Sequence, residues 1–92
     1  EGGKIENVYR LQIMNTAEAR RVFDIGVEGP PSLHVAGESR VDLEPASSRM
    51  VPVRVRIEPW AAQRGTHKIE FNVSAVGVEG VAVREKSVFI VR

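Results

Sequence analysis

Four side chains in this sequence carry atoms that soft metal ions prefer: His34, His67, Met14 and Met50. Imidazole nitrogens and thioether sulfurs suit copper, but a site needs several of them to converge and to be held by supporting groups. No two of the four show the i, i+2 spacing of one strand face or the i, i+4 spacing of one helix face. We therefore predict no metal site, with the methionines padding the hydrophobic interior and the histidines lying at strand ends.

Nucleophiles and carboxylates are equally scattered. Glu70 and Glu79 are isolated in the sequence, and Gly77-x-x-Gly80 precedes a predicted strand rather than the helix that a phosphate-binding loop needs. Asn72-Val73-Ser74 matches the glycosylation sequon, which we interpret as a chance match within a strand. No serine stands in a Gly-x-Ser-x-Gly elbow. The serines lie in predicted turns or on solvent-facing strand positions: Ser32, Ser39, Ser47, Ser48, Ser74 and Ser87. We predict no catalytic residue, no cofactor-binding residue and no small-molecule substrate.

The composition removes further classes of function. The chain has no cysteine, which excludes disulfides, zinc–thiolate centres, iron–sulfur ligation and thiol catalysis within it. Its 13 basic and 12 acidic residues are interspersed and leave a net charge of +1, so no basic stripe exists to collect phosphates. We predict no nucleic-acid partner. No apolar run approaches the ~20 residues that a membrane-spanning helix needs.

Trp60 has two interpretations. It follows Pro59 at the end of the longest predicted strand, where its ring could close one end of the folded domain as a plug. The alternative is an exposed anchor for a protein partner, because tryptophan is enriched among the residues that dominate binding energy at interfaces. The sequence favours the plug, and the solvent exposure of Trp60 separates the two.

The elements that position these side chains are predicted to be strands, because apolar and polar residues alternate along the chain. Shorter runs cover residues 33–35, 40–44 and 87–91, the last with Phe89 and Val91 inward. About seven short strands at spacings of roughly 8–12 residues are typical of a β-sandwich. The 92 residues are therefore predicted to form a single all-β domain, an immunoglobulin-like β-sandwich of about seven antiparallel strands. The four clearest runs have these inward residues: Tyr9, Leu11 and Ile13; Phe23, Ile25 and Val27; Val51, Val53, Val55 and Ile57; Ile69, Phe71 and Val73.

Proline, glycine and asparagine mark the connections. Residues 28–32 must turn, because proline fixes φ and removes a backbone donor, and residues 76–80 are predicted to be a hairpin connection. Residues 15–21 are too few for a stable helix and are predicted to be a loop with at most one turn, which Asn15 could cap. Glu58-Pro59 closes the long strand. Pro52 lies inside that strand and is tolerable near its start or on an unpaired stretch.

Edge strands of a sandwich invite pairing with other chains, and charged side chains along an edge oppose it. Two charged groups are placed to do this: Arg40, Asp42 and Glu44, and the run Arg84-Glu85-Lys86. The alternative, which we favour, is that these residues belong to ordinary solvated strand faces.

The opening segment Gly3-Lys4-Ile5-Glu6-Asn7-Val8-Tyr9-Arg10-Leu11-Gln12-Ile13-Met14-Asn15 resembles the start of the C-terminal immunoglobulin-like domain of the FixG/CcoG/RdxA family. In that family a Gly-x-Ile-Glu-Asn-x-Tyr stretch follows the last membrane helix and leads into an apolar strand. Residues 27–33, 51–57 and 69–73, the last before a terminal strand with Phe89, also resemble the family. The resemblance covers essentially the whole chain.

The resemblance implies a larger protein. Members of the family are bacterial inner-membrane proteins with a ferredoxin-like part that binds two iron–sulfur clusters. The resemblance implies a role in copper delivery, by reduction of cupric ion, and in assembly of the high-affinity haem–copper terminal oxidase. The C-terminal domain is expected on the periplasmic side. Because the cluster-binding cysteines are absent here, iron–sulfur clusters are expected in the parent protein and no cofactor in this domain. The chain begins Glu1-Gly2-Gly3 rather than with Met, so we expect a processed or excised piece of a membrane protein.

On this basis we expect a non-catalytic accessory domain that docks a protein partner: an oxidase subunit or assembly factor, a copper chaperone, or a second copy of itself. Asn7 and Trp60 are the candidate partner contacts, and Tyr9 is predicted to pack in the core with its hydroxyl bonded locally. Two alternatives remain open. One is a domain that holds copper transiently through methionine and histidine, and the other is an unrelated extracellular adhesin or pilus-type sandwich.

Overall fold

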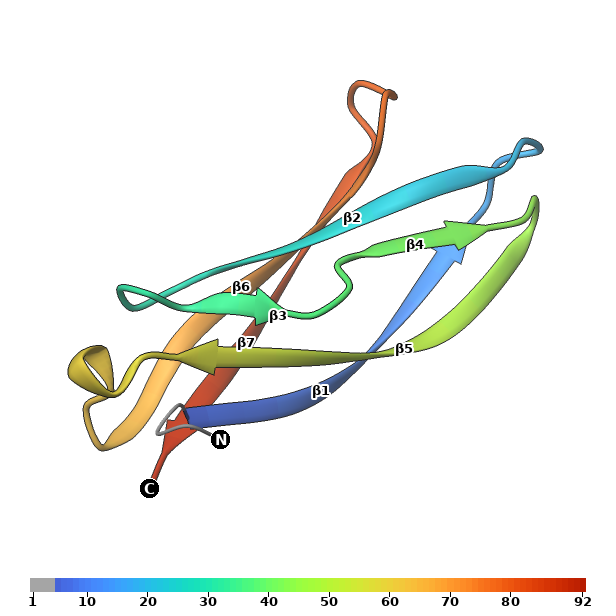
Figure 1. Ribbon diagram of the computed structural model, residues 1–92. Coiled ribbons are helices and arrows are strands. Elements are labelled where there is room, and N and C mark those ends of the chain that lie inside the picture. Colours follow the sequence, from blue (N-terminus) through green and yellow to red (C-terminus); the bar gives the residue numbers. More distant parts are fainter. Residues whose placement is uncertain (1–4) are drawn as a thin grey trace.

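The computed structural model describes residues 5–92, which form two antiparallel β-sheets packed face to face (Figure 1). Gly3 and Lys4, which belong to the segment that resembles FixG, lie outside the described residues. No helix among residues 5–92 is long and apolar enough to cross a membrane. The elements are β1 (Ile5–Asn15), β2 (Arg21–Glu28), β3 (His34–Ala36), β4 (Arg40–Leu43), β5 (Ser47–Ile57), the 3₁₀ turn η1 (Pro59–Ala61), β6 (Gly65–Ala75) and β7 (Ala82–Val91).

The strands are divided between a three-stranded and a four-stranded sheet. The first has the order β1-β5-β3 and the second the order β4-β2-β6-β7, and every pairing is antiparallel. Strand β1 is therefore an edge of one sheet and β7 an edge of the other. This arrangement confirms the predicted sandwich of seven antiparallel strands.

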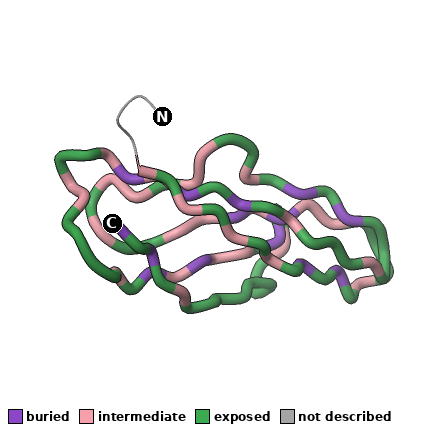
Figure 2. The backbone as a smooth tube through the Cα atoms, turned by 90° about the horizontal axis from the view of Figure 1, so that it is seen from below, coloured by how far each residue is buried: buried purple, intermediate pink, exposed green. Residues whose placement is uncertain are grey.

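The core consists of the inward residues that alternation predicted. Buried and exposed positions alternate along the strands, as Figure 2 shows. Val55, Ile57 and Phe89 are fully inaccessible to solvent. Phe89 and Val91 point inward, while Val88 and Ile90 between and beside them are exposed, which confirms the predicted face of the last strand. An aliphatic interior with three phenylalanines thus holds the two sheets together.

Several strands extend beyond the predicted runs, β5 and β7 among them. Strand β5 begins at Ser47 rather than at residue 51, so Pro52 lies in its middle and not near its start. Pro52 is opposite Arg10 of β1, but β3 reaches only to Arg54 on the other side. The proline therefore lies where β5 has one neighbour instead of two; it is neither near the strand's start nor on an unpaired stretch, the two positions expected from the sequence. Strand β7 begins at Ala82, five residues before the predicted run.

The connections follow their turn residues. Residues 16–20 are irregular, and residues 76–81 form the hairpin connection between β6 and β7, with Gly77 and Gly80 at φ values of 76° and 80°. Such positive φ values strain any residue with a Cβ and favour glycine. A short 3₁₀ turn after Glu58 closes β5 and was not expected from the sequence.

Candidate functional site

Trp60 lies on the outside of the domain and does not plug it. The residue is 75% exposed, in a 3₁₀ turn that has no buried residue. The turn is closed by bonds from the Ala61 amide to Glu58 O (3.0 Å) and from the Ala62 amide to Pro59 O (3.2 Å). Ala61 and Ala62 pack against the core instead, so two small side chains close this end and direct the indole outward. The predicted plug is therefore wrong.

Asn7 joins the two sheets. Its side-chain Nδ2 donates to Ile90 O (3.2 Å), and its Oδ1 accepts from the Ile90 amide (3.1 Å). The carboxamide thus presents one donor and one acceptor to the edge of β7, as a backbone peptide group of a neighbouring strand would. Both polar groups of Asn7 already have partners within the domain. Contact between Asn7 and a partner protein stays a prediction.

Tyr9 strengthens the same junction. Its hydroxyl donates to Val88 O (2.6 Å), and its ring meets Phe71 edge to face with centroids 5.0 Å apart. Burial raises the pKa of the Tyr9 hydroxyl, because a phenolate would lose hydration there. Packing of Tyr9 against the core is confirmed. The hydroxyl is not bonded locally in sequence, however, because its partner belongs to the opposite sheet.

Met14 and Met50 do not pad the interior. They are 62% and 55% exposed, which corrects the prediction. Met14 lies between the buried Ile13 and Asn15, so the alternation of β1 turns it outward. Met50 is opposite Gln12 on the neighbouring strand, so both methionines lie on the outer face of the three-stranded sheet. This face also carries a short ion pair: the Arg56 guanidinium donates to Glu6 Oε1 (2.6 Å), and that bond and charge lower the pKa of the Glu6 carboxyl.

Each histidine ring has a nitrogen within hydrogen-bond distance of a backbone oxygen close to it in sequence. His34 is the first residue of β3, and its Nδ1 is 2.8 Å from Ser32 O. His67 lies near the start of β6, with Nε2 2.6 Å from Gln63 O. Within residues 5–92, no three His, Cys, Asp or Glu side chains gather in a way that could hold a metal ion.

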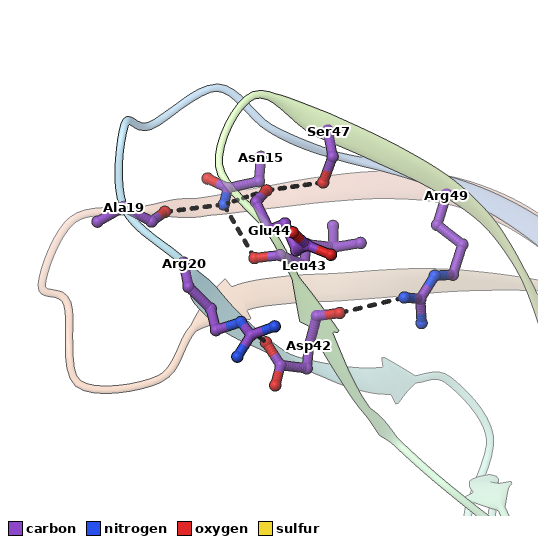
Figure 3. Close-up of polar contacts among 8 residues, drawn as sticks. All are labelled: Asn15, Ala19, Arg20, Asp42, Leu43, Glu44, Ser47 and Arg49. Atoms are coloured by element: carbon purple, nitrogen blue, oxygen red, sulfur yellow. Dashed lines mark hydrogen bonds and ion pairs between the residues drawn. The ribbon is translucent and has the colours of Figure 1, made fainter.

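The far end of the sandwich is fixed by one buried asparagine (Figure 3). Asn15 is 2% exposed, and its Nδ2 faces three carbonyl oxygens, those of Ala19, Leu43 and Glu44, at 3.0–3.2 Å. Its Oδ1 accepts from the Ala17 amide at 3.1 Å, which makes the turn that the sequence allowed it to cap. One side chain therefore ties the loop after β1 to the turn between β4 and β5.

A groove that sequence reasoning missed separates the two edge strands β1 and β7. It has a volume of about 810 Å³. Val83 in β7 lines it and is 63% exposed. The available signal was the run Val81-Ala82-Val83, which extends the last strand toward the hairpin. The apolar residues that line the groove include Leu11, Ile13, Phe23, Phe71, Val73, Val81 and Val83.

These features define a class of protein: an all-β immunoglobulin-like sandwich whose described residues form no catalytic or metal-binding arrangement. A family model described as "IG-like fold at C-terminal of FixG, putative oxidoreductase" matches residues 1–92. The chain therefore belongs to the family of FixG C-terminal immunoglobulin-like domains, which confirms the resemblance. The alternative of an unrelated adhesin-type sandwich is wrong.

Solved structures agree in fold. The crystal structure of a FixG-related protein from Vibrio parahaemolyticus superimposes with a TM-score of 0.85 at 20% identity, over 97% of this chain and 81% of that one. SSP-19, an MSP-domain protein like family member in Caenorhabditis elegans, has a TM-score of 0.54 at 11% identity, over 94% of this chain and 88% of that one. A comparison with curated proteins found no match.

Proposed function

We propose that this domain is a non-catalytic docking module on the periplasmic side of a FixG-type membrane protein. The parent would carry iron–sulfur clusters, transfer electrons to reduce copper, and serve assembly of the high-affinity terminal oxidase. Membership of a family named for an oxidoreductase supports the redox parent. The absence of cysteine from all 92 residues supports a division of labour, because cluster ligation then belongs to other parts of that parent.

The exposed indole of Trp60 is the observation that carries the docking role. A ring that is 75% exposed keeps most of its apolar surface in water, and burying that surface against a partner is favourable. Trp60 lies in a 3₁₀ turn that is closed by the amide bonds of Ala61 and Ala62, so little backbone freedom is lost on binding. The register pairs Ile5 with Ile57 and Gly65 with Val91, so Trp60 lies at the end where β1 begins and β7 ends.

Replacing this side chain in the full-length membrane protein tests the proposal. We expect Trp60→Ala to lower the amount of oxidase assembly factor that co-purifies, and the amount of assembled oxidase in the membranes, by about tenfold or more, as for an interface anchor. The stability of the domain should change by less than about 0.5 kcal/mol, because the ring is exposed.

Val8→Ala is the matched control, since Val8 is also an exposed large apolar residue but lies on the outer sheet face. Unchanged co-purification and unchanged oxidase in Trp60→Ala, beside a normal Val8→Ala, would contradict a docking role for this end of the domain.

Transient copper binding is the second candidate, and the position of the methionines favours it. Met14 and Met50 are exposed on the same face of adjacent strands. They are diagonal neighbours, because Met50 is opposite Gln12 and Met14 is opposite Ser48. Two thioethers alone make a weak site for cuprous ion. If docking is the whole role, titration of the 92-residue chain with cuprous ion under reducing conditions gives the same affinity for the wild type and for a Met14→Leu/Met50→Leu variant. Binding at least tenfold tighter in the wild type would establish the copper role instead.

A further inference from the structure

The apolar floor of the groove belongs to the inner face of β7 and β6 that the opposite sheet does not cover. Val83 and Phe89 lie on the same face of β7, yet Val83 is 63% exposed and Phe89 is fully buried. In Figure 1 the strands β1 and β7 meet near the ends marked N and C and separate toward the β6–β7 hairpin. The core is therefore closed at one end of β7 and open at the other.

The backbone groups of β7 alternate in direction. The ladder between β6 and β7 runs without interruption from Gly65–Val91 to Ser74–Ala82, and the Ala75 amide donates to Val81 O (2.9 Å), so odd-numbered residues of this strand bond β6. Even-numbered residues face the other side, as the bonds of Ile90 and Val88 to β1 side chains show. Arg84 and Lys86 accordingly direct their N–H and C=O groups to the open edge.

The closed half of this edge shows what the open half fits. At Ile90 the carboxamide of Asn7 supplies one donor and one acceptor, and at Val88 the hydroxyl of Tyr9 supplies a donor. These side chains replace the peptide groups of an added strand. Within residues 5–92, no side chain or neighbouring strand bonds the edge-facing backbone of Arg84 or Lys86 in the same way. An extended segment laid there would continue a pairing that Asn7 has begun.

Charge decides which strand the edge accepts. If two copies paired antiparallel through this edge, residues of the same face would lie opposite each other, and Arg84 and Lys86 would face Arg84 and Lys86. Like charges directly opposite each other destabilise a sheet. Arg84 has an ion pair with Glu70 (3.4 Å), whereas Lys86 has none among the described residues. The groove itself is lined by Arg10, Arg21 and Lys86 against Glu85, an excess of positive charge.

We propose that residues 82–86 of β7 bind an extended segment of a partner protein as an added strand. Its acidic side chains face Arg84 and Lys86, and its apolar side chains enter the groove beside Leu11, Val73 and Val83. The charges along 84–86 therefore select an acidic strand rather than forbid all pairing. This inference rests on the docking role, but it uses a surface distinct from Trp60, which lies at the other end of β7.

A short fluorescent peptide in which Val and Glu alternate is the probe, and its binding to the 92-residue chain is measured by anisotropy. We expect binding that a Val–Lys peptide does not share. Lys86→Pro removes one edge donor and one charge without touching the bonds to β6, and should weaken binding about tenfold or more. Val83→Glu, at an exposed position, should weaken it similarly by placing a carboxylate in the groove.

Two controls separate the possible failures. Val8→Glu changes an exposed valine on the outer face of β1 that does not line the groove, and should leave peptide binding unchanged. Trp60→Ala should also leave peptide binding unchanged. The docking role of Trp60, tested in the full-length protein, and strand binding by β7, tested with the peptide, can therefore fail independently. Equal binding of the acidic and basic peptides, or equal binding by Val83→Glu, overturns the proposal. Concentration-dependent dimers that Lys86→Pro abolishes would overturn it in favour of a second copy.

Discussion

Asn15 shows how much one polar side chain can hold at the scale of a residue. Its Nδ2 has two hydrogens for three carbonyl oxygens, in a site that is nearly inaccessible to water. Removing the amide would leave buried carbonyl groups without a donor, and each such group costs about 1–3 kcal/mol. The interaction also joins the ends of two strands, since Asn15 of β1 and Leu43 of β4 are 28 residues apart in sequence.

We expect Asn15→Ala to lower the free energy of unfolding by about 2–3 kcal/mol, as measured by urea denaturation. Asn15→Asp should cost more at neutral pH, because its carboxylate would face carbonyl oxygens. That loss should shrink as the pH falls and the carboxyl becomes protonated. Asn72→Ala is the matched control, since the buried Oδ1 of Asn72 has no partner among the described residues. Equal losses in the two alanine variants would show that the Asn15 contacts contribute nothing of their own.

Residue positions were predictable where alternation applied and unpredictable where it did not. Met14 follows the inward Ile13, so the period of two already turned it outward. The prediction was wrong because it gave the hydrophobicity of Met14 more weight than its position in the alternating pattern. Trp60 lies beyond Pro59 and outside any strand, so no periodicity bears on its direction. The bonds of Asn7 and Tyr9 to β7 depend on how the two sheets cross, which no local pattern encodes.

At the scale of the element, strands were found wherever one face is buried and the other wet. The ends of β5 and β7 were missed for the same physical reason. Residues 47–50 and 82–86 extend past the covered core, so their side chains do not alternate between buried and exposed positions. Their strand conformation comes from backbone pairing with β1 and β6, which a hydrophobic pattern does not report.

Two glycines near the C-terminal end of β2 differ in what surrounds them. A Cβ on Gly29 would lie 2.8 Å from Leu33 Cδ2 and 2.9 Å from Ile69 Cγ2, whereas a Cβ on Gly26 would meet nothing within 4 Å. We expect Gly29→Ala to destabilise the domain by about 1–3 kcal/mol through overpacking. Gly26→Ala should be neutral or stabilise it by up to about 1 kcal/mol, because the unfolded chain loses freedom. Thermal unfolding of both variants checks the pair, and a reversed order would refute this account of the turn after β2.

The whole molecule is a rod with principal extents of 44 × 23 × 18 Å. Trp60 lies near the end where β1 begins and β7 ends, while the groove opens along the hairpin half of β7. The fold and the family were predictable from the sequence because both rest on patterns that run through the whole chain. The groove was not, since it arises from the divergence of two sheets whose strands are far apart in sequence.

The position of Asn7 and Tyr9 also determines how the domain responds to mechanical force. Strand β1 starts and β7 finishes at the same end, and these two side chains are the contacts that bridge the strands there. Tension that pulls this pair of ends apart would load those bridges first and then unzip each ladder one rung at a time, instead of shearing many bonds together. Because these bonds would break one after another, we expect a low unfolding force when the start of β1 and the end of β7 are pulled apart.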